Sequence, residues 1–237
     1  MIAGEVTIDG APAGKPGQFV SRDADVAVAP NRRQFVSRGG NKLANGLDVL
    51  GVDPQGRSAI DAGASTGGFT DCLLQRGARR VAAVDVGYGE FAWELRQDDR
   101  VAVLERTNAR HLVAGDLPWP VDLAVCDLSF ISLAKVLPAV IGCLEPGWDV
   151  VALVKPQFEV GPELVGKGGV VRDPAIRRRA LISVAEAAVG LGAGVVGFAS
   201  SGLPGPKGNL ETFIHLADER GVSDGEEIER LAKMVEP

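Results

Sequence analysis

The chain has 237 residues, enough for one α/β domain with a small appendage. Hydrophobic residues make up 46% and charged residues 24%, an ordinary balance for a soluble globular protein. The net charge of −6 excludes a global basic signature for nucleic acid, so local patches must be judged separately. No apolar stretch approaches the ~20 residues that span a membrane, and no charged-then-apolar signal opens the chain, so we expect a cytoplasmic protein without a membrane span.

The cysteines and histidines exclude further classes of site. The three cysteines form no Cys-x-x-Cys pair and lie in apolar runs, which is typical of buried thiols in a reducing compartment. With only His111 and His215, a zinc site or a histidine-based triad is not expected. We therefore predict a protein that needs no metal.

Residues 1–30 form a distinct segment. Residues 4–10 alternate and then turn, while Val20 and residues 24–28 are typical of further short strands. Residues 30–33 are typical of a linker. We predict a small N-terminal β segment.

From Phe35 onward, strands alternate with helices, which predicts an α/β fold with a mostly parallel, seven-stranded sheet and helices on both faces. The last two strands are joined through 201–208 without a helix, so the last strand is expected to be antiparallel. The expected strands are 58–61, 80–85, 101–105, 121–126, 149–154, 194–200 and 209–216.

The first strand ends in a glycine-rich turn that predicts a nucleotide-type site. Asp61 closes the strand, Gly63 begins the turn, and a helical pattern opens at Phe69. The turn lacks Gly-x-Gly-x-x-Gly, and an acid at the strand end instead suits the cationic amino-acid end of S-adenosylmethionine (SAM). Asp85 ends the second strand, about 20 residues further on, where such folds place a carboxylate on the ribose hydroxyls. The alternative is a glycine-rich turn that binds nothing.

Two later segments have less specific patterns. The connection 156–172, at about 17 residues, is longer than most connections between helices and strands, and it contains glycines and cations. This pattern indicates either a loop that closes on phosphate or a mobile solvent loop. Asp173-Pro174 predicts a helix start, and 217–237 predicts an acidic tail with a short exposed helix. The stripe expected to be buried on the helix from Asp173 is Leu181, Val184, Ala188 and Leu191.

Four polar residues lie at strand ends or just ahead of the sheet: Lys42, Asp127, Lys155 and Glu211. The carboxyl ends of parallel strands form the ligand crevice of such sheets, and an antiparallel last strand begins at that same edge. Singly, each residue could be a helix cap or a surface charge. Together around one crevice, they indicate a catalytic group.

The sequence resembles the TlyA family, also labelled hemolysin A, of rRNA 2′-O-methyltransferases related to the FtsJ type. The resemblance rests on Ser37–Leu43, Asp61–Phe69, Asp85–Gly89, Cys126–Ser132 and Val154–Glu159. It implies a Rossmann-like, SAM-dependent methyltransferase domain over 31–217, followed by the tail 218–237. It further implies a Lys-Asp-Lys-Glu tetrad at Lys42, Asp127, Lys155 and Glu211. The implied cofactor residues are Asp61, Gly63, Ser65, Thr66, Gly67, Gly68, Phe69, Asp85, Val86, Asn108 and Asp127.

The resemblance implies methyl transfer from SAM to a ribose 2′-hydroxyl of ribosomal RNA, with cytidine as the expected nucleotide and rRNA or ribosomal subunits as partners. Residues 1–30 resemble only the strand-rich second half of an S4 RNA-binding domain, so we expect a partial one. RNA contacts are expected from Arg32, Arg33 and Arg38 and from the 167–172 loop. Residues 177–179 are expected on a solvated helix face.

Three rival functions are weighed against this one. A nicotinamide oxidoreductase would need the dinucleotide turn. A SAM-dependent small-molecule methyltransferase would share the cofactor site, but the two lysines argue against it. A cytolysin, suggested by the hemolysin label, would need a membrane-inserting segment, and the sequence offers none.

Overall fold

The computed structural model describes residues 6–14, 17–28, 34–205 and 207–236. The chain forms two compact units, Met1–Gln34 and Phe35–Pro237. Among the described residues, no helix is both long enough and apolar enough to cross a membrane.

The first unit contains a three-stranded antiparallel sheet in the order β2-β1-β3. Its strands are β1 (Val6–Ile8), β2 (Ala11–Pro12) and β3 (Val26–Val28). The strand expected around Val20 is absent: this side chain is 45% exposed and lies outside the strands. The expected RNA contacts Arg32 and Arg33 lie outside the described residues.

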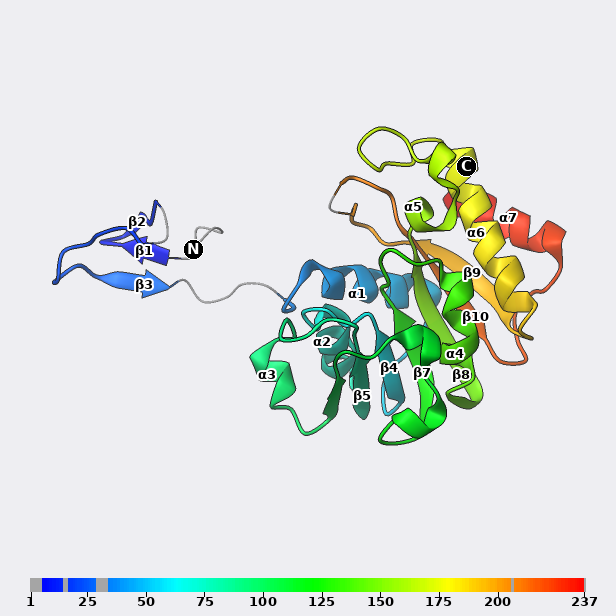
Figure 1. The fold of residues 1–237 in the computed structure, drawn as a ribbon, viewed down its shortest axis with the longest axis horizontal. Coiled ribbons are helices and arrows are strands. Elements are labelled where there is room, and N and C mark those ends of the chain that lie inside the picture. The colour runs from blue at the N-terminus through cyan, green and yellow to red at the C-terminus, as the bar shows by residue number, and fades with distance from the viewer. Residues whose placement is uncertain (1–5, 15–16, 29–33, 206, 237) are drawn as a thin grey trace. The chain divides into compact units, whose positions relative to one another are not determined.

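The second unit is built on a seven-stranded sheet in the order β6-β5-β4-β7-β8-β10-β9 (Figure 1). Strands β6, β5, β4, β7 and β8 are parallel, and β10 is antiparallel to both of its neighbours, as predicted. The strands are β4 (Ser58–Ala62), β5 (Arg80–Val84), β6 (Val101–Leu104), β7 (Val121–Cys126), β8 (Leu144–Val154), β9 (Gly194–Ser200) and β10 (Thr212–Ala217).

Helices cover both faces of this sheet, which confirms the predicted fold class (Figure 1). Along β8, Val151 and Leu153 pack into the core beneath α1 and α2, whereas Val150 and Ala152 pack into the core beneath α4, α6 and α7. This alternation follows from the period of two along a strand buried on both sides. The helices are α1 (Arg38–Leu50), α2 (Gly68–Gln75), α3 (Trp93–Arg96), α4 (Leu137–Ile141), α5 (Pro156–Glu159), α6 (Pro174–Val189) and α7 (Gly225–Val235).

Two strands begin several residues from the predicted start, and β4, β5, β6 and β10 each end one residue from the predicted end. β8 begins at Leu144 rather than at 149, because its pairing with β7 shifts register between Val121 and Leu123 and carries the Pro146-Gly147 pair inside the strand. β10 begins at Thr212 rather than at 209.

The expectations for α6 and the tail also need correction. α6 begins after the Asp173 cap as predicted, but it ends at Val189, so Leu191 lies beyond it and is 41% exposed. α7 is not a fully exposed helix, because Ile228 is buried in the core that it shares with α6. Arg177 was expected on a solvated face, yet it is 9% exposed. Its guanidinium forms an ion pair with Glu236, 2.7 Å away, which ties the end of the chain to α6.

Candidate functional site

Four parallel strands deliver the polar residues of the site to one edge of the sheet. Asp61 lies at the end of β4, Asp85 follows β5, Asp127 follows β7 and Lys155 follows β8. β10 runs the other way and pairs Thr212 with Val154, so the residue before it, Glu211, begins at this same edge. The ligand crevice of open α/β sheets lies at such an edge.

The turn after β4 requires glycine at position 63. Gly63 has φ +89°, a conformation that side chains disfavour, and its N–H donates to Val84 O at 2.8 Å. A Cβ atom here would lie 2.4 Å from the Asp127 carbonyl oxygen. The turn therefore packs directly against the backbone that carries Asp127.

Asp85 is held in a fixed orientation by one N–H group of this turn and one of the connection after β5. Its Oδ2 accepts from Ser65 N at 2.8 Å, and its Oδ1 accepts from Gly87 N at 2.6 Å. Each carboxylate oxygen still has a free lone pair, so the group can accept from a ligand hydroxyl without losing these bonds.

Asp61 lies beneath this turn with no exposed surface. Its Oδ2 accepts from Thr70 Oγ1 at 2.7 Å, while its Oδ1 has no hydrogen-bond partner. Burial is the main cause that raises the pKa of Asp61 to about 7; the Thr70 hydrogen bond opposes it, and the charges of Asp127 and Asp85 add to it. A buried carboxylate with one unsatisfied oxygen is suited to a cationic partner.

A cavity of about 350 Å³ opens over the turn. Six of the eleven predicted cofactor residues line it: Gly63, Ser65, Asp85, Val86, Asn108 and Asp127. Asp61, Thr66, Gly67, Gly68 and Phe69 do not. Phe69 is a core residue whose ring lies 6.0 Å from that of Phe213, and Gly67 caps α2 with φ +93°.

Sequence reasoning missed several lining residues of this first cavity. Glu90 and Thr107 belong to the connections after β5 and β6, where neither spacing nor periodicity singles them out. Their position after a parallel strand is the one signal that could have found them.

The predicted tetrad forms two separate ion pairs. Lys155 Nζ lies 2.5 Å from Asp127 Oδ1 and donates to Ser129 Oγ at 3.1 Å. Lys42 Nζ, from α1, lies 2.5 Å from Glu211 Oε2, and these two side chains are only 9% and 1% exposed. Glu211 therefore pairs with Lys42 and not with Lys155.

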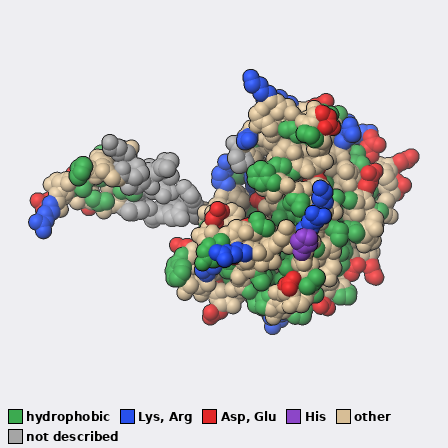
Figure 2. Space-filling view, viewed as in Figure 1, with side chains coloured by type: hydrophobic (Ala, Val, Ile, Leu, Met, Phe, Trp, Pro, Cys, Tyr) green, Lys and Arg blue, Asp and Glu red, His purple; other side chains and the backbone are tan. Residues whose placement is uncertain are grey.

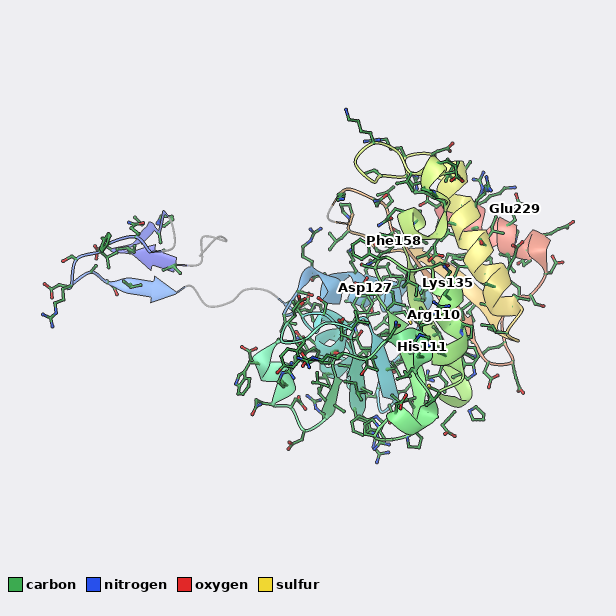
Figure 3. All side chains as sticks on the ribbon, viewed as in Figure 1. Arg110, His111, Asp127, Lys135, Phe158 and Glu229 are labelled. Carbon is green, nitrogen blue, oxygen red and sulfur yellow. The ribbon has the colours of Figure 1, made fainter. Side chains whose placement is uncertain are left out.

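A second cavity, of about 390 Å³, adjoins the first. Lys155 and Glu211 line it, and it shares Ser129 and Phe130 with the first cavity. Because Asp127 lines the first cavity and Lys155 the second, their ion pair spans the boundary between the two. Figure 3 shows Asp127 near the centre of this unit.

The 156–172 connection closes one side of the second cavity. It is not structureless, since it contains α5, a helical turn at Pro162–Leu164 and a bridge between Gly166 and Val170. Asn209, 3% exposed, anchors it: Oδ1 accepts from Val171 N at 2.9 Å, and Nδ2 donates to Gly169 O at 2.8 Å. Asn209 was missed by the sequence analysis.

Comparison with known proteins places this site in a family. The FtsJ-like methyltransferase family matches residues 35–218. The 16S/23S rRNA (cytidine-2′-O)-methyltransferase TlyA of Mycobacterium tuberculosis is 55% identical over 215 residues, which are 90% of this chain and 80% of TlyA. Hemolysin A of Brachyspira hyodysenteriae is 34% identical over 220 residues, or 91% of this chain and 90% of that protein.

A solved structure named "Putative hemolysin from Streptococcus thermophilus" superposes with a TM-score of 0.81 at 39% identity, covering 98% of this chain and 86% of that one. The family match covers most of the chain, including both cavities and both ion pairs. The chain belongs to the FtsJ-like methyltransferases and, among them, to the TlyA group.

Proposed function

We propose that this chain transfers a methyl group from SAM to a ribose 2′-hydroxyl of ribosomal RNA, with cytidine as the modified nucleotide. One observation carries the proposal: the Lys155–Asp127 ion pair lies where a cofactor-sized cavity meets a second cavity lined by Lys155 and Glu211. The cytidine and rRNA specificity rests on the similarity to TlyA of Mycobacterium tuberculosis.

The residues around the first cavity fit SAM. The fixed Asp85 carboxylate, which lines the cavity, suits the ribose hydroxyls of SAM, while Asp61 lies behind the cavity wall and supports the turn through its hydrogen bond with Thr70. Gly63 also lines the cavity, and the absence of a side chain there lets the turn pack against the Asp127 backbone. When bound, SAM supplies a methyl group activated by a positively charged sulfur.

The acceptor site has to align the hydroxyl and remove one proton. We assign Lys155 to the 2′-oxygen, which would form its bond to the methyl carbon as the carbon–sulfur bond of SAM breaks, with the sulfur kept as a neutral thioether. Lys155 can accept the hydroxyl proton once its own proton has passed to water, and Asp127 then stabilises the ammonium that forms again. Alignment supplies most of the remaining rate enhancement.

Lys42 and Glu211 act behind Lys155. Their buried pair places a fixed carboxylate in the wall of the acceptor cavity. Because Thr212 pairs with Val154, this wall is tied by sheet hydrogen bonds to the strand that carries Lys155. We assign to the pair the positioning of Lys155 and of the ribose.

The RNA would be held by surfaces outside the tetrad. We propose that residues 1–30 act as a partial S4-like RNA-binding segment, and that the 31–217 domain carries the chemistry. An enzyme acting on ribosomal RNA would work in the cytoplasm.

The test is direct. Purified protein, tritiated SAM and rRNA transcripts or ribosomal subunits that lack 2′-O-methyl groups should yield labelled RNA, with the modification mapped to cytidine ribose. Lys155→Ala should bind SAM with unchanged affinity, measured by calorimetry, and should give no labelled RNA. Near-normal turnover by Lys155→Ala would overturn the assignment, and labelling of a base rather than a ribose would overturn the reaction.

A further inference from the structure

A third cavity, of about 410 Å³, adjoins the two cavities of the proposed site. Phe130 lines all three cavities, and Phe158 lines both the acceptor cavity and this third one. The third cavity is lined by Arg110, Phe130, Ile131, Ser132, Lys135 and Phe158. Figure 3 shows Arg110, Lys135 and Phe158 on the side of the unit where Asp127 lies, and Figure 2 shows basic and hydrophobic side chains together on this face.

The charge of this cavity is unbalanced. Arg110 and Lys135 are both exposed, and among the described residues neither forms an ion pair. The neighbouring Glu159 does not line this cavity, and its Oε1 accepts from Leu133 N at 2.9 Å. In a chain of net charge −6, two unpaired cations that converge on one cavity indicate an anionic ligand.

The same cavity has an aromatic wall. The ring centroids of Phe130 and Phe158 lie 5.2 Å apart with the rings tilted by 47°. Phe130 is 91% exposed and has φ +64°, a left-handed conformation that is strained for a bulky residue. The strained backbone of Phe130 and the exposure of its apolar ring to water both cost free energy. Such strained positions cluster at ligand sites.

Cations beside an apolar aromatic wall match a nucleotide, which combines a phosphate with a flat base. The position of the cavity indicates which nucleotide. Phe130 and Phe158 line both this third cavity and the acceptor cavity. When the ribose of one nucleotide contacts Lys155, the neighbouring nucleotide of the same RNA strand would therefore reach the third cavity. We propose that this cavity is the subsite for the nucleotide next to the methylated one, with its phosphate on Arg110 and Lys135 and its base against Phe158. This inference rests on the proposed function.

The decisive variant is Arg110→Ala/Lys135→Ala. The matched control is Arg79→Ala/Arg179→Ala, which removes the same charge from two exposed arginines outside all three cavities. Filter binding to an rRNA transcript at several salt concentrations should show roughly ten- to hundredfold weaker binding for the first variant. The slope of log affinity against log salt should fall by about 0.7, the value for one single-stranded phosphate. The charge-retaining variant Arg110→Lys/Lys135→Arg should recover most of the slope.

Phe158→Leu tests the aromatic wall. It should weaken binding to the transcript without changing the salt slope, because it removes an uncharged stacking contact.

The outcomes separate this inference from the proposed function. If the wild-type protein fails to methylate rRNA, the proposed function is wrong. If the wild type methylates rRNA but Arg110→Ala/Lys135→Ala binds with the affinity and slope of the arginine control, the subsite is wrong. Unchanged SAM affinity in every variant confirms that the fold is intact.

Discussion

Replacing Lys42 by methionine should destabilise the protein far more than an ordinary loss of charge. Lys42 Nζ lies 2.5 Å from Glu211 Oε2, and the two side chains are 9% and 1% exposed. Removing one partner leaves a desolvated carboxylate without its cation, which costs about 3–5 kcal/mol in buried pairs. We expect Lys42→Met to lower the free energy of unfolding by about that amount.

The double variant Lys42→Met/Glu211→Gln separates electrostatics from packing. It leaves neither charge unpaired, so it should be clearly more stable than the sum of the two single changes implies. The control is Lys233→Met on α7, whose partner Glu229 lies 2.8 Å away with both side chains more than half exposed. That exposed pair should contribute only about 0.3–0.5 kcal/mol.

Urea unfolding followed by circular dichroism measures these free energies, and a methyl-transfer assay runs beside it. In the double variant we expect stability to recover but not methyl transfer, because the tetrad is broken in the single and in the double variant alike. A cost for Lys42→Met no greater than that for Lys233→Met would refute the reasoning. Strict additivity of the two single changes would refute it as well.

Three further results are expected. Asp85→Ala should weaken SAM binding, measured by calorimetry, by the roughly 1.5–3 kcal/mol of hydrogen bonds to a charged group; unchanged affinity in a folded variant would remove Asp85 from the cofactor site. Lys155→Arg keeps a cation beside Asp127 but cannot accept a proton, so methyl transfer to rRNA, measured with tritiated SAM, should be lost; an active arginine variant would show that Lys155 only orients the hydroxyl. Burial raises the pKa of Asp149, but hydrogen bonds from His215 and Arg57 outweigh burial and lower it to about 2, against an ordinary value of 3.8. The lowered pKa stabilises the folded protein at pH values above 3.8, and this stabilisation is lost as the pH falls toward 2. Between pH 5 and pH 2, the free energy of unfolding should therefore fall by about 2 kcal/mol less for Asp149→Asn than for the wild type.

The sequence was sufficient for the sheet and its edge. Each parallel strand shows a short apolar run ending at a polar residue, and the helix-free connection before β10 predicts its antiparallel direction. Both signals are local, so they need no knowledge of distant contacts. Asp127, Lys155 and Glu211 could therefore be placed at one edge before the structure was known.

The partners within that group could not be predicted. Which lysine Glu211 contacts depends on where α1 crosses the sheet and on the register of β10 against β8. Both are set by distant packing, such as the approach of the Phe213 ring to Gly46, where a Cβ atom would lie 2.5 Å from the ring. No spacing within the sequence reports such a contact.

The third cavity escaped the sequence analysis for a different reason. Its lining comes from short helical turns and loops at Ala109–His111, Leu133–Lys135 and α5. These segments are too short to show a hydrophobic period, and their cations look like ordinary surface charges. Only the folded chain shows that no carboxylate of the described residues forms an ion pair with Arg110 or Lys135.

The order of the strands explains why the two halves of the reaction meet at Asp127. The cofactor cavity takes its lining from the connections after β4, β5, β6 and β7, and the acceptor cavity from those after β7 and β8 and before β10. The connection after β7 is the one that both cavities share, and Asp127 is its first residue. A carboxylate at this position can contact the donor side and pair with Lys155 on the acceptor side. The inserted β10 completes the acceptor side, because a strand running in the opposite direction brings its first residues, with Glu211 just before them, to the edge where the parallel strands end.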